Sequence, residues 1–110
     1  MAKGYIVQDL KNWNFNKTFE RSDSLRDLAT PILREYGGKV LVRTPHSETK
    51  EGKKPGIVVI FEFESMDKAR KFYESDAYQA VKAVRDKACD ADLYLVEGVT
   101  GFDRKGNKSK

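Results

Sequence analysis

The order in which two kinds of apolar pattern alternate along the chain constrains its fold more than any other feature. Apolar segments of strand length and composition cover residues 3–10, 40–43, 57–64 and 91–97. Apolar residues at three- and four-residue spacing, typical of helices, cover residues 25–36 and 65–84. The order strand, helix, strand, strand, helix, strand allows two right-handed crossovers and one antiparallel sheet with the helices on a single face. The sequence therefore predicts an α+β, ferredoxin-like βαββαβ fold with a four-stranded antiparallel sheet.

Glycine and serine residues mark the expected limits of the helices. Gly37 and Gly38 follow the first helical pattern, where a left-handed helix stop is expected. Ser65 precedes the second pattern and is expected to cap its first turn, and Ser75 offers another cap inside it. We therefore expect the second helical segment to break and restart at Ser75.

Both faces of the predicted sheet carry apolar side chains near its middle. The strand at 57–64 has four apolar side chains on one face and two on the other, namely Ile57, Val59, Phe61 and Phe63, and Val58 and Ile60. In the last strand Leu93 and Leu95 alternate with Tyr94 and Val96. A solvated sheet face would be polar at every second residue. We therefore expect a second copy of the chain to cover the face away from the helices, forming a homodimer.

Length and composition indicate one domain. The 110 residues are 39% apolar and 35% charged, and residues 1–100 suffice for a single core. The basic segment 101–110 has little to bury and is expected to be a mobile tail. No apolar run approaches the ~20 residues that span a bilayer, and the N-terminal residues do not resemble a signal peptide. We expect a cytoplasmic protein without membrane contact.

The net charge of +4 is unevenly distributed. Residues 39–56 and residues 101–110 each carry +3, so the rest of the chain carries −2. A nucleic-acid-binding domain normally shows its basic residues on a structured face. A charge confined to one loop and a tail argues against a nucleic-acid partner.

The single cysteine and the single histidine exclude several kinds of site. Cys89 alone can form neither an intrachain disulfide nor a thiolate metal cluster, and His46 alone cannot supply the usual two or three imidazole ligands. No metal or cofactor is expected. Cys89 lies in a helical pattern and is expected to be a half-buried packing residue. His46 lies in a polar loop, where it would titrate near neutral pH but is more often simply solvated.

Four segments of the sequence resemble a known family. They are GYIVQDL near the N-terminus, YGGKVLVR at 36–43, IVVIFEFESMDKARKFYESDAYQAVKAVR at 57–85, and LYLVEG at 93–98. Together they make residues 3–98 similar to the domain-of-unknown-function 1330 family (DUF1330), which belongs to the dimeric α+β barrel superfamily. The resemblance implies two ferredoxin-like sheets packed face to face. The superfamily includes cofactor-free monooxygenases, polyketide cyclases, muconolactone-type isomerases and haem or chlorite enzymes, whereas no general activity is assigned to DUF1330.

The first candidate site residues are Arg43 and Glu62. Arg43 ends an apolar strand, and its guanidinium would clamp a ligand carboxylate or enolate. The alternative is an ion pair with Glu62 or Glu97. Glu62 follows Val58 and Ile60 on its side of the strand, where apolar neighbours would favour a general base near neutral pH. The alternative is a solvated or paired residue at the rim of the sheet.

Three further candidates lie in the second helical segment. Tyr73 and Tyr78 flank the expected helix break, where they would line an apolar pocket with hydroxyl groups available to a ligand, or pack in the core. Arg85 lies near the helix end and would contribute a fixed positive charge, although the helix dipole alone also favours a cation there.

Three functions are compatible with these residues. The first is a cofactor-independent enzyme, an isomerase, cyclase or monooxygenase-like protein acting on a small organic acid or carbonyl compound, with Arg43 and Glu62 as catalytic residues. The second is a non-catalytic small-molecule-binding protein or a structural dimer. The third is an RNA-binding module, which the same βαββαβ order also serves. Phe61 and Phe63 are expected to face the helices, and Glu62 and Glu64 would repel phosphate, so RNA binding is disfavoured.

Overall fold

The predicted order of strands and helices is confirmed by the computed structural model, which describes residues 2–13 and 26–99. The elements in order are β1 (Gly4–Lys11), a helix at residues 26–35, β2 (Lys39–Thr44), β3 (Ile57–Phe63), α2 (Met66–Glu74), α3 (Asp76–Ala88) and β4 (Asp90–Glu97). The second helical segment is interrupted at Ser75, as expected. The tail at 101–110, for which mobility was expected, lies outside the described residues.

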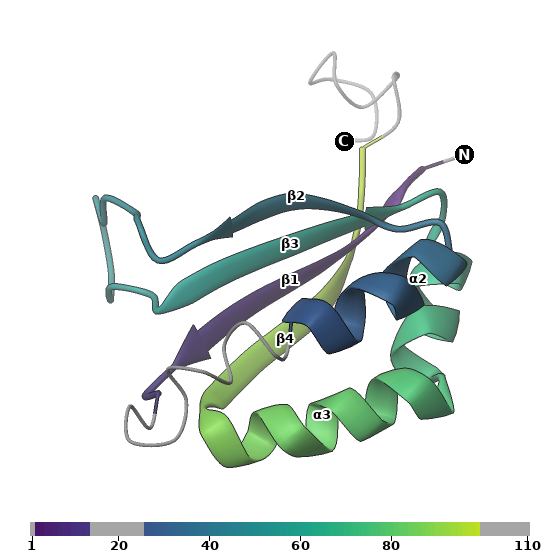
Figure 1. Ribbon diagram of the computed structural model, residues 1–110. Coiled ribbons are helices and arrows are strands. Elements are labelled where there is room, and N and C mark those ends of the chain that lie inside the picture. The colour runs from purple at the N-terminus through teal and green to yellow at the C-terminus, as the bar shows by residue number, and fades with distance from the viewer. Residues whose placement is uncertain (1, 14–25, 100–110) are drawn as a thin grey trace.

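The four strands form one antiparallel sheet in the order β2-β3-β1-β4. The central strand β1 pairs with β3 on one side and β4 on the other, so that Val7 lies opposite both Ile60 and Tyr94. All three helices lie on the same face of this sheet (Figure 1). The chain therefore has the ferredoxin-like fold that its sequence predicts.

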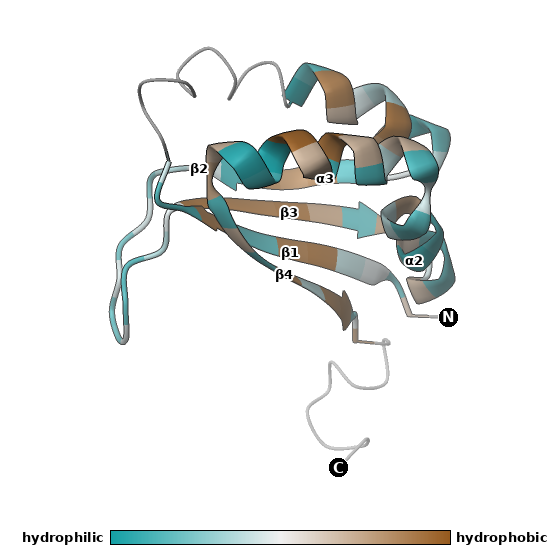
Figure 2. Cartoon of the chain, turned by 90° about the horizontal axis from the view of Figure 1, so that it is seen from below, coloured by the Kyte–Doolittle hydropathy of each residue, from teal (hydrophilic) through white to brown (hydrophobic). Residues whose placement is uncertain are grey.

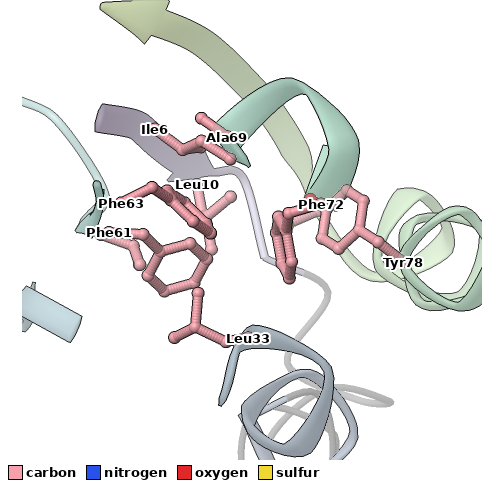
Figure 3. Close-up of a cluster of buried hydrophobic side chains, with 10 residues drawn as sticks. Ile6, Leu10, Leu33, Phe61, Phe63, Ala69, Phe72 and Tyr78 are labelled. Carbon is pink, nitrogen blue, oxygen red and sulfur yellow. The ribbon is translucent and has the colours of Figure 1, made fainter. Parts of the chain in front are cut away.

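Phe72 of α2 lies at the centre of the hydrophobic core between the helices and the sheet. It is fully buried, and its ring centroid lies 5.3 Å from that of Phe63, 5.9 Å from Phe61 and 4.8 Å from Tyr78. Figure 3 shows these rings together with Leu33 from the helix at 26–35. Phe61 and Phe63 thus face the helices, because side chains alternate along β3.

The helix ends follow the local signals in the sequence. Gly37 has a positive φ of 74°, and Gly38 N–H donates to the carbonyl of Leu33 at 2.9 Å, as in a Schellman stop. At the α2–α3 junction Ser75 Oγ accepts from Tyr78 N–H at 3.1 Å and donates to the carbonyl of Phe72 at 2.8 Å. One serine thus joins the last turn of α2 to the first turn of α3 and fixes the backbone at Tyr78.

The face of the sheet away from the helices, called the open face below, is apolar at its middle. Register and alternation place seven apolar or aromatic side chains there: Tyr5, Val7, Val42, Val58, Ile60, Tyr94 and Val96. Tyr94 is 54% exposed and Val96 is 43% exposed. Hydrophobic colouring runs along β1 and β3 (Figure 2), and Figure 1 shows that the helices cover only one side of the sheet. Within the two described ranges, no helix is both long and apolar enough to cross a membrane.

Candidate functional site

A pocket of about 70 Å³ lies between the helix at 26–35, α3 and the helix-facing side of the sheet. It is called the helix–sheet pocket below. Half of its lining residues are apolar: Ala29, Leu33, Val40, Val59, Phe61 and Val81. The others are polar or aromatic with a polar tip: Gln8, Arg26, Thr30, Arg43, Tyr78 and Arg85. An apolar cavity with a few convergent polar groups is the usual form of a small-molecule site.

Arg85 is the group in this pocket whose bonding is least complete. The residue is only 7% exposed. Its Nη1 donates to the Tyr78 hydroxyl at 2.7 Å and its Nη2 donates to Asp86 Oδ1 at 3.2 Å. Its Nε–H is buried and has no hydrogen-bond partner. An unsatisfied buried donor costs roughly 1–3 kcal/mol, and more when it is charged, so an acceptor from a ligand would remove this penalty.

The positive charge of Arg85 is only partly balanced by Asp86. The other oxygen of that carboxylate, Oδ2, accepts from Lys82 Nζ at 2.9 Å. One carboxylate is therefore shared between two cations, and the three groups together carry one net positive charge. Partial burial alone would raise the pKa of Asp86, but the hydrogen bonds from Lys82 and Arg85 outweigh it and lower the pKa below its ordinary value. Asp86 is thus ionised and a poor base at neutral pH.

Tyr78 presents a hydroxyl hydrogen beside this arginine. Its oxygen accepts from Arg85, which leaves its own O–H available to donate to another group. Burial raises the pKa of Tyr78, and the nearby Arg85 charge opposes this effect without cancelling it. The hydroxyl therefore stays protonated at neutral pH and remains a donor.

Gln8 of β1 contributes an amide that the sequence analysis did not identify as a site residue. It is 5% exposed and belongs to the helix-facing row with Ile6 and Leu10. The sequence did carry a signal for this residue, since Gln8 is the polar member of the row formed by Ile6 and Leu10. A buried amide normally finds a hydrogen-bond partner in the protein or in a ligand.

A β-bulge brings Arg43 into the helix–sheet pocket. In a regular strand Val40 and Arg43 would face opposite sides of the sheet, because they are three residues apart. The register of β2 shifts between Val40 and Val42, so that Val40 lies opposite Phe61 and Arg43 opposite Val59. Both side chains therefore line the pocket.

Glu62, the candidate base, lies on the opposite side of the sheet. It alternates with the buried Phe61 and Phe63, and its Oε2 accepts a hydrogen bond from the Tyr5 hydroxyl at 3.0 Å. The structure thus does not bring Glu62 together with Arg43, and an ion pair between them is not formed. The hydrogen bond to Glu62 raises the pKa of Tyr5.

Tyr73 supports the pocket without lining it. Its ring packs against Tyr78 with the centroids 5.5 Å apart, and its backbone carbonyl accepts from Gln79 Nε2 at 2.6 Å. Of the five predicted site residues, the structure therefore brings Arg43, Tyr78 and Arg85 together, and leaves Tyr73 behind Tyr78 and Glu62 on the open face.

His46 and Cys89 lie outside the helix–sheet pocket. His46 is exposed in the loop between β2 and β3, beside a shallow polar hollow that also involves Glu48 and Lys54. Cys89 is buried at the end of α3, and burial raises its pKa to about 11, so the thiol is not a nucleophile at neutral pH. In the described part of the chain, no three His, Cys, Asp or Glu side chains are grouped as metal ligands.

The chain matches the model of a known protein family. The family model for a domain of unknown function, DUF1330, matches residues 3–99. The chain belongs to the DUF1330 family. None of the curated proteins matches the sequence of this DUF1330 protein.

Solved structures with low sequence identity share the fold. A Rhodopseudomonas palustris protein of unknown function, RPA0582, has a TM-score of 0.68 at 14% identity, over 90% of this chain and 84% of that one. A Caulobacter crescentus protein described as a candidate antibiotic biosynthesis monooxygenase has a TM-score of 0.65 at 20% identity, over 90% and 92% of the two chains. A Nitrosomonas europaea protein with a similar description has a TM-score of 0.60 at 13% identity, over 91% and 92%. These matches show that DUF1330 shares the α+β fold of such proteins.

The RNA-binding hypothesis required exposed aromatic side chains on the third strand. In this DUF1330 protein Phe61 is 7% exposed and Phe63 is 1% exposed, and both pack against Phe72 on the helix side. Strand β3 therefore offers no aromatic surface for stacking bases.

Proposed function

We propose that this DUF1330 protein binds a small organic acid as its anion in the helix–sheet pocket. The buried, unpartnered Nε–H of Arg85 is the observation that carries this proposal. A ligand carboxylate that displaces the atoms covering this N–H would accept a charge-assisted hydrogen bond from it, which is about twice as strong as a neutral one. Arg43 lines the same pocket and adds a second cation to attract an anion.

The size and walls of the pocket limit the ligand. A cavity needs roughly 10–15 Å³, measured as the space open to the centre of a water-sized sphere, to hold one water molecule. The observed value of about 70 Å³ therefore corresponds to a handful of non-hydrogen atoms. Val59, Phe61 and Leu33 provide apolar walls for the body of the ligand. A short-chain acid, or the carboxylate end of a single-ring acid whose ring extends toward the solvent side of the pocket, fits this combination of volume, apolar wall and cation.

An enzyme acting on the same ligand is the second candidate. Its chemistry would be cofactor-independent and of the isomerase, cyclase or monooxygenase type, and two neighbours of the same fold are described as candidate monooxygenases. However, the described lining residues include no carboxylate, imidazole or thiol that would serve as a general base. Binding is therefore the function that the geometry supports best.

We also infer that the protein works as a homodimer joined through the open face. Val7 and Ile60 lie at the centre of this face, directly opposite one another, and Tyr94 and Val96 extend the apolar surface along β4. A self-complementary interface would remove these side chains from water. Interfaces of this kind bury at least about 1,000 Å² in total.

Calorimetric titration with benzoate and benzamide tests the binding proposal, because the two ligands have nearly the same shape and only benzoate is charged. We expect the wild-type protein to bind benzoate and not benzamide. Arg85→Met should abolish benzoate binding, whereas Lys87→Met, an equal charge change at an exposed position of the same helix, should not. Equal binding of both ligands, or benzoate binding that survives in Arg85→Met, would overturn the proposal. Should Arg85→Met fail to fold, Arg85→Lys tests the same point, because it keeps the charge and lacks the Nε–H.

A further inference from the structure

The floor of the helix–sheet pocket runs across three neighbouring strands. Gln8 of β1 lies opposite Val59 of β3, Val59 lies opposite Arg43 of β2, and all three residues line the pocket. Neighbouring strands lie about 4.8 Å apart, so the backbones of Gln8 and Arg43 are separated by roughly 10 Å. The pocket therefore extends across the sheet, from a central strand to the edge strand β2.

The two ends of this floor differ in exposure. Gln8 is buried, and Tyr78 and Arg85 of α3, which also line the pocket, are buried too. Arg43 at the other end is exposed, and so is Arg26 of the helix at 26–35. The pocket therefore has a buried part and a mouth, and the two exposed arginines of its lining belong to the mouth.

Arg26 and Arg43 lie at the same end of the two elements that carry them. The turn at 36–38 joins the helix at 26–35 to β2, and these two elements run in opposite directions (Figure 1). At about 1.5 Å per helical residue and about 3.3 Å per strand residue, each arginine lies about 15 Å from that turn. One guanidinium from the helix and one from the sheet are thus brought to the same mouth.

Positive charge dominates the lining of the pocket. The described lining residues include no carboxylate and three arginines, namely Arg26, Arg43 and Arg85. Asp27 lies 3.8 Å from Arg26, outside the lining. Asp86 lies 3.2 Å from Arg85, is shared with Lys82, and is also outside the lining. These four cations and two carboxylates leave two net positive charges, which the two carboxylates of one ligand would balance.

We propose, resting on the anion site proposed above, that the ligand is a dicarboxylic acid bound as its dianion. One carboxylate enters the buried part, and the second stays at the mouth, where Arg26 and Arg43 bind it. A guanidinium offers paired N–H donors that match a carboxylate in both geometry and charge. Because the mouth is open to solvent, the second carboxylate keeps part of its hydration and its desolvation costs little. The apolar body between the two carboxylates lies on Val59 and Phe61.

The length of the floor determines which dicarboxylic acids fit. Carboxylates at opposite ends of a short chain or a ring can reach the buried part and the mouth at once. Carboxylates on adjacent atoms leave the body of the ligand on the same side, so only one of them can be placed. Terephthalate has the first arrangement and its isomer phthalate has the second, at the same charge.

Calorimetric titrations with terephthalate, its monomethyl ester and phthalate test this inference. The ester has nearly the shape of terephthalate without the second charge, and phthalate has both charges in the wrong arrangement. We expect terephthalate to bind the wild-type protein about tenfold more tightly than either, which is the effect of about one charge-assisted hydrogen bond. Equal binding of terephthalate and its ester overturns the inference, and so does equal binding of terephthalate and phthalate.

Substitution of the exposed arginines locates the second carboxylate. Arg43→Met should remove the preference for terephthalate over its ester, and Arg26→Met should reduce it. Arg34→Met removes another exposed arginine of the same helix, one that does not line the pocket, and should keep the preference. A preference that survives in both mouth variants overturns the inference. So does an equal fall in Arg34→Met and Arg43→Met, because it shows only a general attraction of dianions to a basic surface.

The benzoate titration separates this inference from the proposed function. Benzoate binding that depends on Arg85, without a preference for terephthalate over its ester, refutes the second carboxylate and leaves the anion site intact. Absence of both benzoate and terephthalate binding refutes the anion site itself and this inference with it.

Discussion

Arg85 Nη1 donates a hydrogen bond of 2.7 Å to the hydroxyl of Tyr78, seven residues earlier on the same helix. Seven residues are about two helical turns, so both side chains leave α3 on the same face and meet beneath the sheet. Both residues are more than 90% buried. This pair holds the guanidinium in place while its Nε–H remains without a partner, and the proposed chemistry of the pocket follows from that arrangement.

Removal of the Tyr78 hydroxyl should destabilise the protein. Tyr78→Phe keeps the ring that packs on Phe72 and deprives a buried arginine of its acceptor, which we expect to cost about 1–3 kcal/mol. Tyr73→Phe is the matched control, because Tyr73 is half-buried and its ring packs on Tyr78 without a hydroxyl contact to Arg85. Urea denaturation measures both variants. Equal losses in the two variants would contradict a specific role for the Tyr78–Arg85 hydrogen bond.

The serine between α2 and α3 should matter more than an ordinary helix cap. Ser75→Ala removes a bond to Tyr78 N–H and a bond to the Phe72 carbonyl, and we expect it to cost about 1–2 kcal/mol. Ser65→Ala removes only the single cap bond to Lys68 N–H at 3.2 Å and should cost less. Chemical denaturation of the two variants checks the order. A loss in Ser65→Ala equal to or greater than that in Ser75→Ala would contradict it.

Local sequence signals were sufficient to predict the fold. Alternation in β3 placed Phe61 toward the helices and Ile60 away from them, and the glycine at position 37 marked the helix end, because these patterns depend on neighbouring residues only. The interruption at Ser75 was visible for the same reason. Such signals report which face a side chain occupies.

The site was predicted less completely, because convergence of side chains depends on tertiary structure. Arg43 reaches the pocket only through the register shift in β2, and no turn or glycine in that strand announces the shift. Glu62 looked suitable as a base from its apolar neighbours, but those neighbours belong to the open face. Gln8 shares a row with Ile6 and Leu10 by alternation along β1, yet its burial depends on the helices that cover this face of the sheet.

Substitution of Ile60 tests the proposed dimer. Ile60 lies on the open face opposite both Val7 and Val42, so Ile60→Glu would bury an unpaired charge in the interface and should separate the two copies. Light scattering should give twice the 12.6 kDa of the chain for the wild type and the single mass for the variant. Ala80→Glu, at an exposed position of α3, is the control and should remain dimeric. A wild-type mass of one chain would exclude the dimer.

The buried thiol predicts how stability depends on pH in alkali. Burial raises the pKa of Cys89 from about 9 to about 11, so between these values the folded protein keeps a proton that the unfolded chain releases. Stability should therefore fall as the pH rises through this window. Between pH 9 and pH 11, Cys89→Ala should lose less stability than the wild type does. Denaturation curves recorded at both ends measure the difference, and parallel losses in the two proteins would contradict the burial of this thiol.

The Nε–H resonance of Arg85 in a ¹⁵N-correlated NMR spectrum tests the central claim most directly, because that hydrogen should contact the ligand. The resonance is assigned by its disappearance in Arg85→Lys. On addition of benzoate we expect this signal to move downfield in a saturable manner, since its hydrogen gains a charge-assisted hydrogen bond. Backbone signals of Gln8 and Val59 at the pocket should move with it. A benzoate titration that leaves the Arg85 Nε–H signal unchanged, while shifting only signals from the loop at 45–56, would contradict an anion site in the helix–sheet pocket.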